Sequence, residues 1–290
     1  MKNLKTLALC AFIAGCIVAC QKEDLSDTTV EQINLEETQE PTKEQLDKLF
    51  KMGVNIEQVT IQDIPLPDGS KEKYLVSGDI TIPVDDLAEY PDLKSSDGKN
   101  KQYHSDFIVA PPYRNIRVLG WTGTGSSFDL TPKMRTALSW AVANYNALPN
   151  TLNFTLSYGN NQSQADMVVY RVIGGAGGSA GFPTSAGRPN RYVRINSGLD
   201  SGTYSLNVVE HVIGHEIGHS VGFRHQDWYN RWSCGYTGPL PAEPSVSPAA
   251  IWIPGTPWSP YADSIMLGCF GTVEDGEFTA SDRDALNILY

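Results

Sequence analysis

Residues 215–225 read HEIGHSVGFRH, which places three histidines, a glutamate and a glycine at the spacing H-E-x-x-H-x-x-G-x-x-H. In a helix, residues four apart lie on one face, so His215 and His219 can reach a single metal ion. Glu216 lies beside that face, where it can contact a metal-bound water without being a ligand. Gly222 can end the helix and let the chain bring His225 to the same ion. The short H-E-x-x-H pattern is only suggestive, but the extended pattern is specific for a metal site.

We expect this stretch to lie on a helix from about Tyr204 to Val221. Its apolar residues share one face, which we expect to be buried: Leu206, Val209, Ile213, Ile217 and Val221. Gly214 and Gly218 lie in another sector, where we expect a strand to pack closely. His211 precedes His215 by one turn, but no glutamate follows it. We therefore interpret His211 as a residue behind the ligands or at the surface. The alternative for the whole stretch is an amphipathic helix with incidental histidines.

The flanking sequence predicts one α+β domain. Apolar patterns indicate strands at 116–119, 152–158, 167–173 and 192–195 and helices at 130–148 and 279–290. Pro132 suits a first helical turn, and Thr279 suits an N-cap with Asp282 three residues later. The glycine-rich residues 174–183 lack the lysine and the following helix of a phosphate-binding P-loop.

The motif resembles the metzincin zinc signature, and the wording HEIGH followed by GFRHQD is similar to the HEIGH metallopeptidases, family M57. Ser264-Ile265-Met266 resembles the methionine turn that metzincins place beneath the zinc. The resemblance covers roughly residues 106–290. It implies a zincin-like fold with a twisted mixed sheet, an active-site helix, and a C-terminal subdomain with the methionine turn and a last helix. One departure is Gly268, where some relatives have a tyrosine.

The resemblance implies a zinc-dependent endopeptidase. One Zn²⁺ would be held by His215, His219 and His225, and Glu216 would be the general base that takes a proton from the attacking water. Substrate would run antiparallel along an edge strand, which we expect at residues 192–196. The alternatives are a surface binding protein or adhesin on the same scaffold with little catalysis, and a protein that processes only itself. The intact glutamate argues against the former. A structural Ca²⁺ stays open, although the sequence has no D-x-[DN]-x-[DN]-G loop.

The first 19 residues are typical of a lipoprotein signal peptide. A charged start is followed by an apolar run at 7–18, which is too short to span a membrane. We favour Cys20 as the lipidated residue, with Cys16 as the alternative. The residues that follow, QKED, resemble the export signal of surface lipoproteins in Bacteroidota. We therefore expect an exported protein anchored by lipid to the outer membrane or cell surface.

Residues 20–42 are acidic and predict a solvated tether, and residues 43–105 predict a small pro-like segment with a linker. That segment should contain a helix at 44–50 and strands at 73–76 and 80–83. Gly78-Asp79-Ile80 resembles the segment of astacin pro-peptides whose aspartate caps the zinc. Asp79 is thus a candidate for latency, and the alternative is an ordinary turn aspartate. A cysteine switch is excluded, because residues 21–110 contain no cysteine.

The net charge of −11 and the lack of a basic cluster argue against nucleic-acid binding. We expect protein or peptide substrates, membrane association through the lipid, and a monomer. Cys234 and Cys269 are the cysteines left in an exported chain after the lipidated one, which predicts a disulfide between them.

Overall fold

The computed structural model describes residues 39–91, 102–228, 231–235, 250–256 and 262–290. The helices are α1 (Lys43–Lys51), α2 (Pro132–Asn146), α3 (Leu206–Ser220) and α4 (Ala280–Leu289). The strands are β1 (Thr60–Pro65), β2 (Lys71–Ser77), β3 (Ile80–Pro83), β4 (Tyr103–His104), β5 (Asn115–Trp121), β6 (Asn153–Gly159), β7 (Met167–Val172), β8 (Gly178–Ser179), β9 (Tyr192–Asn196), β10 (Phe223–Arg224) and β11 (Ile251–Trp252). The predicted signal peptide with Cys16 and Cys20, most of the tether and the middle of the linker lie outside the described residues. Within the described part of the chain, no helix has the length and apolar character needed to cross a membrane.

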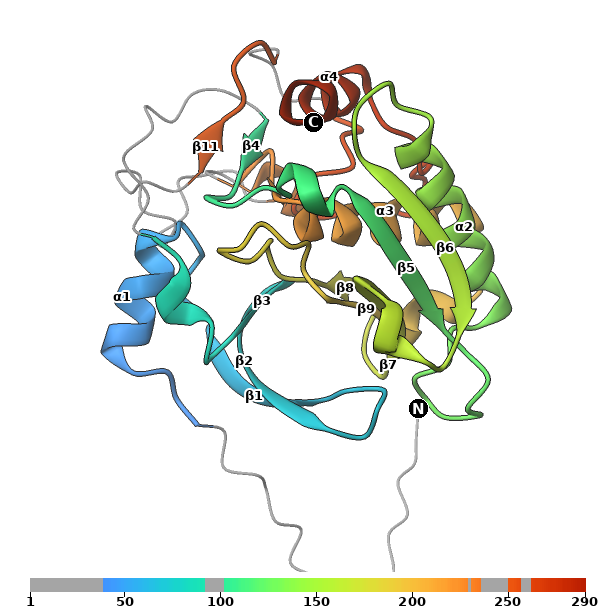
Figure 1. Ribbon diagram of the computed structural model, residues 1–290, viewed down its shortest axis with the longest axis horizontal. Coiled ribbons are helices and arrows are strands. Elements are labelled where there is room, and N and C mark those ends of the chain that lie inside the picture. Colours follow the sequence, from blue (N-terminus) through green and yellow to red (C-terminus); the bar gives the residue numbers. More distant parts are fainter. Residues whose placement is uncertain (1–38, 92–101, 229–230, 236–249, 257–261) are drawn as a thin grey trace, which may run out of the picture. The chain divides into compact units, whose positions relative to one another are not determined.

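A five-stranded sheet in the order β6-β5-β7-β9-β8 forms the centre of the molecule (Figure 1). Its strands are parallel except β8, which is antiparallel to β9. Helices α2 and α3 pack on one face, and their buried side chains share a core with β5, β7 and β9. Thr131 caps α2, and the predicted apolar face of that helix is buried: Met134, Leu138, Ala141, Val142 and Tyr145. The predicted mixed α+β fold is confirmed.

The edge of this sheet is β8, so the prediction of an edge at residues 192–196 is wrong. Strand β9 lies inside the sheet because the glycine-rich stretch folds back and pairs with it, Gly178 opposite Ile195 and Ser179 opposite Arg194. A Cβ at position 178 would lie 2.9 Å from the carbonyl oxygen of Arg194. Only glycine permits that approach. The glycine-rich stretch therefore supplies the edge strand of the sheet beside α3.

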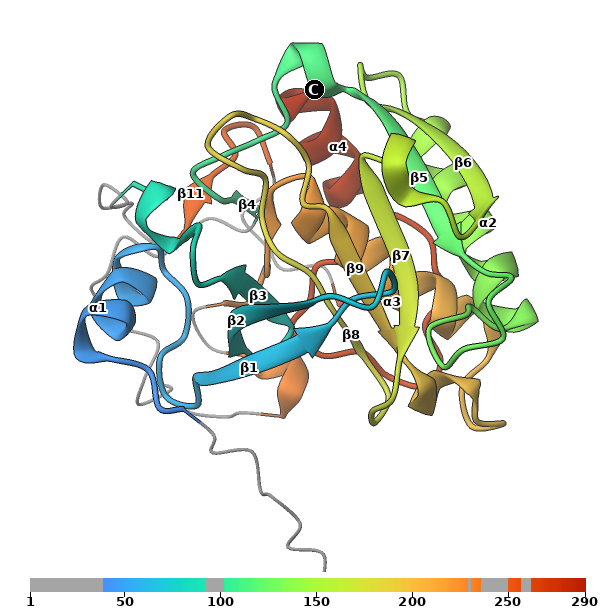
Figure 2. The same ribbon diagram turned by 60° about the horizontal axis from the view of Figure 1, so that its bottom comes forward.

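The N-terminal segment forms a three-stranded antiparallel sheet, β1-β2-β3, with α1 beside it. Strand β1 was not predicted, because only Ile61 of its residues is fully buried and its pattern does not alternate clearly. The turn between β1 and β2 reaches the outer face of the five-stranded sheet (Figure 2), where Leu66 packs in a cluster with Leu119 and Tyr170. The segment thus covers the sheet face opposite α2 and α3.

The end of the predicted linker is part of a second small sheet. Strand β4 pairs with β10 and with β11, and Gln102 and Tyr103 are fully buried. Gln102 donates hydrogen bonds to Ser281 and Asp282 at the start of α4. The chain therefore enters the second part of the molecule a few residues earlier than expected, next to the strand that leads to His225.

Candidate metal centre

Helix α3 holds the motif in the interior of the protein. Ser205 caps its first turn, and every residue from Val208 to Ser220 is buried. What packs against Gly214 and Gly218 is the predicted methionine turn, so the expected strand is absent from that sector. A Cβ at Gly214 would lie 2.6 Å from Cδ1 of Ile265, and one at Gly218 would lie 2.6 Å from the sulfur of Met266.

The bend after α3 depends on Gly222. Its φ of 109° is in the left-handed region, and a Cβ there would lie 2.8 Å from the carbonyl oxygen of Phe107. Both features require glycine. The bend starts β10, whose Phe223 carbonyl accepts a hydrogen bond from Nδ1 of His219 at 2.8 Å. His225 follows directly and turns towards the helix.

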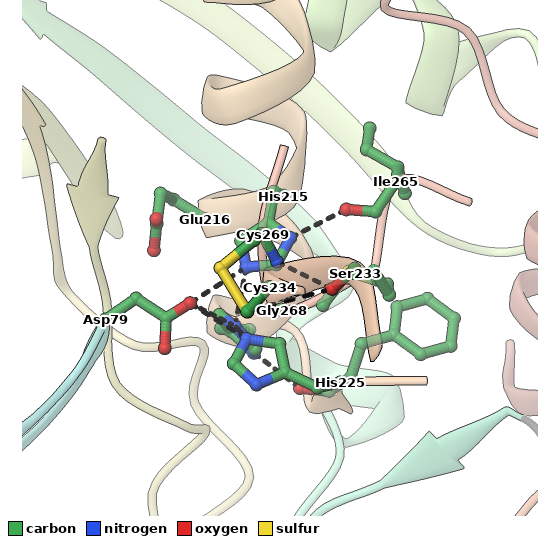
Figure 3. Close-up of polar contacts among 12 residues, drawn as sticks. Asp79, His215, Glu216, His225, Ser233, Cys234, Ile265, Gly268 and Cys269 are labelled. Carbon is green, nitrogen blue, oxygen red and sulfur yellow. Dashed lines mark hydrogen bonds and ion pairs between the residues drawn. A yellow bond between two sulfur atoms is a disulfide. The ribbon is translucent and has the colours of Figure 1, made fainter. Parts of the chain in front are cut away.

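The structure brings His215, His219 and His225 together at their Nε2 atoms (Figure 3). Nε2 of His219 is 3.0 Å from Nε2 of His215 and 3.1 Å from Nε2 of His225. His215 and His219 both use Nδ1 to donate to backbone carbonyls, of Ile265 at 2.6 Å and of Phe223.

Those two Nδ1 bonds assign the tautomers, so the Nε2 atoms of both neutral imidazoles carry lone pairs. Two lone pairs that face each other at 3.0 Å cannot form a hydrogen bond. They repel unless a cation lies between them. A tetrahedral zinc ion with bonds of about 2.1 Å separates its ligand atoms by about 3.4 Å, which is close to the distances found. The histidines therefore fit a metal ion.

Asp79 from the N-terminal segment completes the cluster. Its Oδ2 is 2.8 Å from Nε2 of His225 and 3.3 Å from Nε2 of His215, and the carboxylate points towards these rings in Figure 3. Burial opposes the charged carboxylate, but the neighbouring histidines, His225 first, outweigh it and hold the pKa of Asp79 well below its usual range. All four side chains lie within ligand reach of one point.

Glu216 lies beside the cluster with a buried carboxylate. Its Oε2 has no hydrogen-bond partner within the described part of the chain. Burial, and then the charge of Asp79, raise the pKa of Glu216 well above its usual value. A Cβ at Gly178 would lie 2.7 Å from Oε1 of Glu216, so the glycine of the edge strand makes room for this carboxylate. A buried carboxylate oxygen without a partner among the described residues is uncommon and marks a candidate functional group.

A cavity of about 490 Å³ adjoins the cluster, lined in part by Asp79, His215 and Glu216. His211 also lines it and is 3% exposed, so the surface position considered for it is wrong. Burial and the nearby His215 lower the pKa of His211 to about 3. The segment directly after Met266, residues 267–270, also lines this cavity.

The predicted disulfide between Cys234 and Cys269 is present. Sequence reasoning missed Asp227, which supports it. Oδ2 of Asp227 accepts hydrogen bonds from the backbone and side chain of Ser233, and Oδ1 accepts one from the backbone of Gly268 at 2.8 Å. Two connections therefore join the segment after His225 to the segment after Met266: the disulfide and the hydrogen bond from Gly268 to Asp227. The sequence feature that could have identified this residue is the wording HQD at 225–227, which begins with the third histidine.

Comparison with known proteins agrees with this geometry. Residues 74–290, about three quarters of the chain, match the model of a family described as dual-action HEIGH metallo-peptidase, M57. Two solved structures of myroilysin are similar, with TM-scores of 0.37 and 0.36 and identities of 15% and 12%. They cover 61% and 69% of this chain and 79% and 99% of their own. No curated protein matches. The family match confirms the resemblance read from the motif: the chain belongs to the HEIGH metallopeptidases, which are metal-dependent enzymes acting on proteins or peptides.

Proposed function

We propose that this protein is a zinc-dependent endopeptidase whose metal is held by His215, His219 and His225. The observation that carries the proposal is the convergence of three Nε2 atoms, two of them with fixed lone pairs, beside the unpaired carboxylate of Glu216. Zinc bound to three imidazoles supplies an acidified ligand water and polarises a substrate carbonyl.

The protein's own residues perform the remaining work. Glu216 accepts the proton of the attacking water at its carboxylate and returns it to the leaving amine. The edge strand β8 offers backbone groups to an extended substrate, which orients the scissile bond over the histidines. The edge strand can pair with an internal segment of a substrate protein as well as with a chain end, which favours endopeptidase action.

Glu216→Gln tests this proposal, because the amide keeps the size of the side chain and loses the base. Cleavage of casein by the full chain should fall by at least about a hundredfold, while the zinc content stays at that of the wild type. Glu277→Gln, which changes an exposed glutamate in the loop before α4, is the matched control. Casein cleavage that is equal in wild type and Glu216→Gln would refute the proposal and favour a binding protein on the same scaffold.

We also propose that the N-terminal segment keeps the enzyme latent through Asp79. Besides the carboxylate at the histidines, the backbone of this segment occupies the edge of β8. The amide of Ala180 donates to the carbonyl of Asp79 at 2.9 Å, and the amide of Thr81 donates to the carbonyl of Ala180 at 2.8 Å. The pairing is parallel, opposite in direction to an antiparallel substrate. The segment therefore fills the substrate edge in an orientation that is unsuited to cleavage.

A second anchor of the N-terminal segment lies next to the third histidine. Arg224 is buried, and its guanidinium donates hydrogen bonds to the carbonyls of Met52, at 2.8 Å, and Gly53, at the end of α1. Charge-assisted bonds of this kind are stronger than neutral ones. The segment is thus held on both sides of the metal centre.

The change Asp79→Ala tests the latency proposal in the full chain. Loss of the charge-assisted contact with His225, worth about 1.5–3 kcal/mol, should raise the initial rate of casein cleavage by at least about tenfold. Asp85→Ala removes an exposed aspartate from the same segment and should leave the rate at that of the wild type. An unchanged rate in Asp79→Ala would reduce Asp79 to a turn residue.

For the cell, we propose export and lipid anchoring at Cys20, with Cys16 as the alternative, supported by the sequence of the first 24 residues. Labelling with a radioactive fatty acid should persist in Cys16→Ala and disappear in Cys20→Ala. The reverse result would identify Cys16 as the lipidated residue. If neither variant is labelled, the proposal of a lipid anchor at Cys20 or Cys16 is refuted. We further propose that the chain acts as a monomer, which sedimentation of the soluble part tests.

A further inference from the structure

The cavity beside the metal ligands contains one basic side chain other than histidine among its described lining residues, and that side chain is Arg231. The rest of the lining combines two carboxylates, Asp79 and Glu216, with glycines, small polar and aliphatic residues, two histidines and two aromatic rings. These rings, of Tyr204 and Phe270, have centroids 6.1 Å apart. A guanidinium that borders a cavity of about 490 Å³ favours a negatively charged group next to it.

Arg231 has a backbone conformation that the fold must impose. With φ of 48° it is the one non-glycine residue with positive φ in the described part of the chain. Its amide donates to the carbonyl of Asp227 at 2.7 Å, and the side chain of Asp227 accepts two bonds from Ser233, the neighbour of the disulfide-bonded Cys234. Strained backbone conformations of this kind concentrate at functional positions. Here the strained backbone of Arg231 sets the direction of its side chain.

The side chain of Arg231 lies across Gly268. A Cβ at position 268 would be 3.0 Å from Nη1 and 3.2 Å from Cδ of Arg231. Any other residue at 268 would push the guanidinium away. Gly268 itself is fixed by its hydrogen bond to Asp227. The departure noted in the sequence, a glycine two residues after the turn methionine, thus provides the space in which the arginine lies.

The position of this cavity along the substrate follows from the edge strand. The cavity is lined by residues 176–178, at the start of β8, while the N-terminal segment pairs with Ala180 beyond its end. A substrate antiparallel to β8 runs from 180 towards 176. The cavity therefore receives residues on the carboxyl-terminal side of the scissile bond.

We propose that Arg231 makes this cavity select substrates with a carboxylate on the carboxyl-terminal side of the scissile bond. That carboxylate is the side chain of an internal aspartate or glutamate, or the α-carboxylate of a chain end. A guanidinium binds either in a bidentate fashion. The inference rests on the proposed peptidase function and names the substrate class of the same site.

Cleavage-site mapping on a library of proteome-derived peptides tests the inference. The enzyme is the full chain with Asp79→Ala, which removes the carboxylate that borders the cavity. Aspartate and glutamate should be enriched about tenfold over asparagine and glutamine within two residues after the cut. Arg231→Gln should abolish this enrichment, and Arg231→Glu should replace it with lysine and arginine. Arg135→Gln, on α2 and outside the cavity lining, should retain it. Synthetic peptides made with a C-terminal amide and an intact aspartate side chain separate the two sources, since only selection of chain ends is lost with them.

A binding measurement separates failure of the inference from failure of the proposed function. Zinc-loaded full chain with Asp79→Ala and Glu216→Gln is titrated with a fluorescein-labelled alanine-rich peptide that carries one aspartate, and with its asparagine twin. Tenfold tighter binding of the aspartate peptide that disappears with Arg231→Gln supports the inference even if no cleavage occurs. Glu216-dependent cleavage with no effect of Arg231 on selectivity or binding overturns it and leaves the peptidase function intact.

Discussion

Glu210, one turn before Gly214 on α3, should make the stability of the protein fall as pH rises. It is 3% exposed, and its Oε1 accepts a hydrogen bond from Asn144 at 3.0 Å. Burial, and then the charge of Glu277, raise its pKa from 4.5 to about 7, although the bond from Asn144 opposes this. Between these values the unfolded chain has released a proton that the folded protein retains. The free energy of unfolding therefore decreases from about pH 4.5 to about pH 7.

The size of this effect follows from the difference between the two pKa values, which corresponds to at most about 3 kcal/mol. Glu210→Gln keeps the shape and can still accept from Asn144, but it carries no charge at any pH. The free energy of unfolding is measured by urea denaturation of the zinc-loaded proteins at pH 5 and pH 8. The difference between Glu210→Gln and the wild type should change by about 1–3 kcal/mol in favour of the variant at the higher pH. Comparing the two proteins removes the pH dependence of the metal site, which they share. Equal changes in both would refute the reasoning.

Two further substitutions test the frame of the metal centre. Gly222→Ala adds left-handed strain and a contact of 2.8 Å with the carbonyl oxygen of Phe107, so it should cost about 3 kcal/mol in urea denaturation. Gly235→Ala, with φ of 81° and open space around it, should cost only about 1 kcal/mol, and equal costs would refute the predicted clash. Replacing Cys234 and Cys269 together by serine should lower stability by about 4 kcal/mol, because their bond closes a loop of 35 residues. A loss below about 1 kcal/mol would contradict this.

The convergence of the three histidines could be predicted from the sequence because local spacing determines most of it. His215 and His219 are one helical turn apart in any α-helix, and Gly222 permits one kind of bend. The confirmed elements, such as α2 and α4, likewise carry their own caps and apolar faces. These features depend on neighbours within a few residues.

The errors concern contacts between distant parts of the chain. The pattern of β9 indicates a strand, but only the return of the glycine-rich stretch shows that β9 is covered. His211 is polar and was placed at the surface as one alternative, yet the segment after Met266 closes over it. The arrangement of Asp227 depends on Ser233 and Gly268, which no local pattern links. Pairings over tens of residues cannot be inferred from the periodicity of one element.

Zinc stoichiometry of the dialysed full chain tests the central claim most directly. His219 is fully buried with its Nε2 between those of His215 and His225, whereas His211 is equally buried but outside the cluster. The wild type and His211→Gln should each retain one zinc ion per chain, and His219→Gln should retain none. Zinc retained by His219→Gln, or lost from His211→Gln, would contradict the assignment of the metal centre.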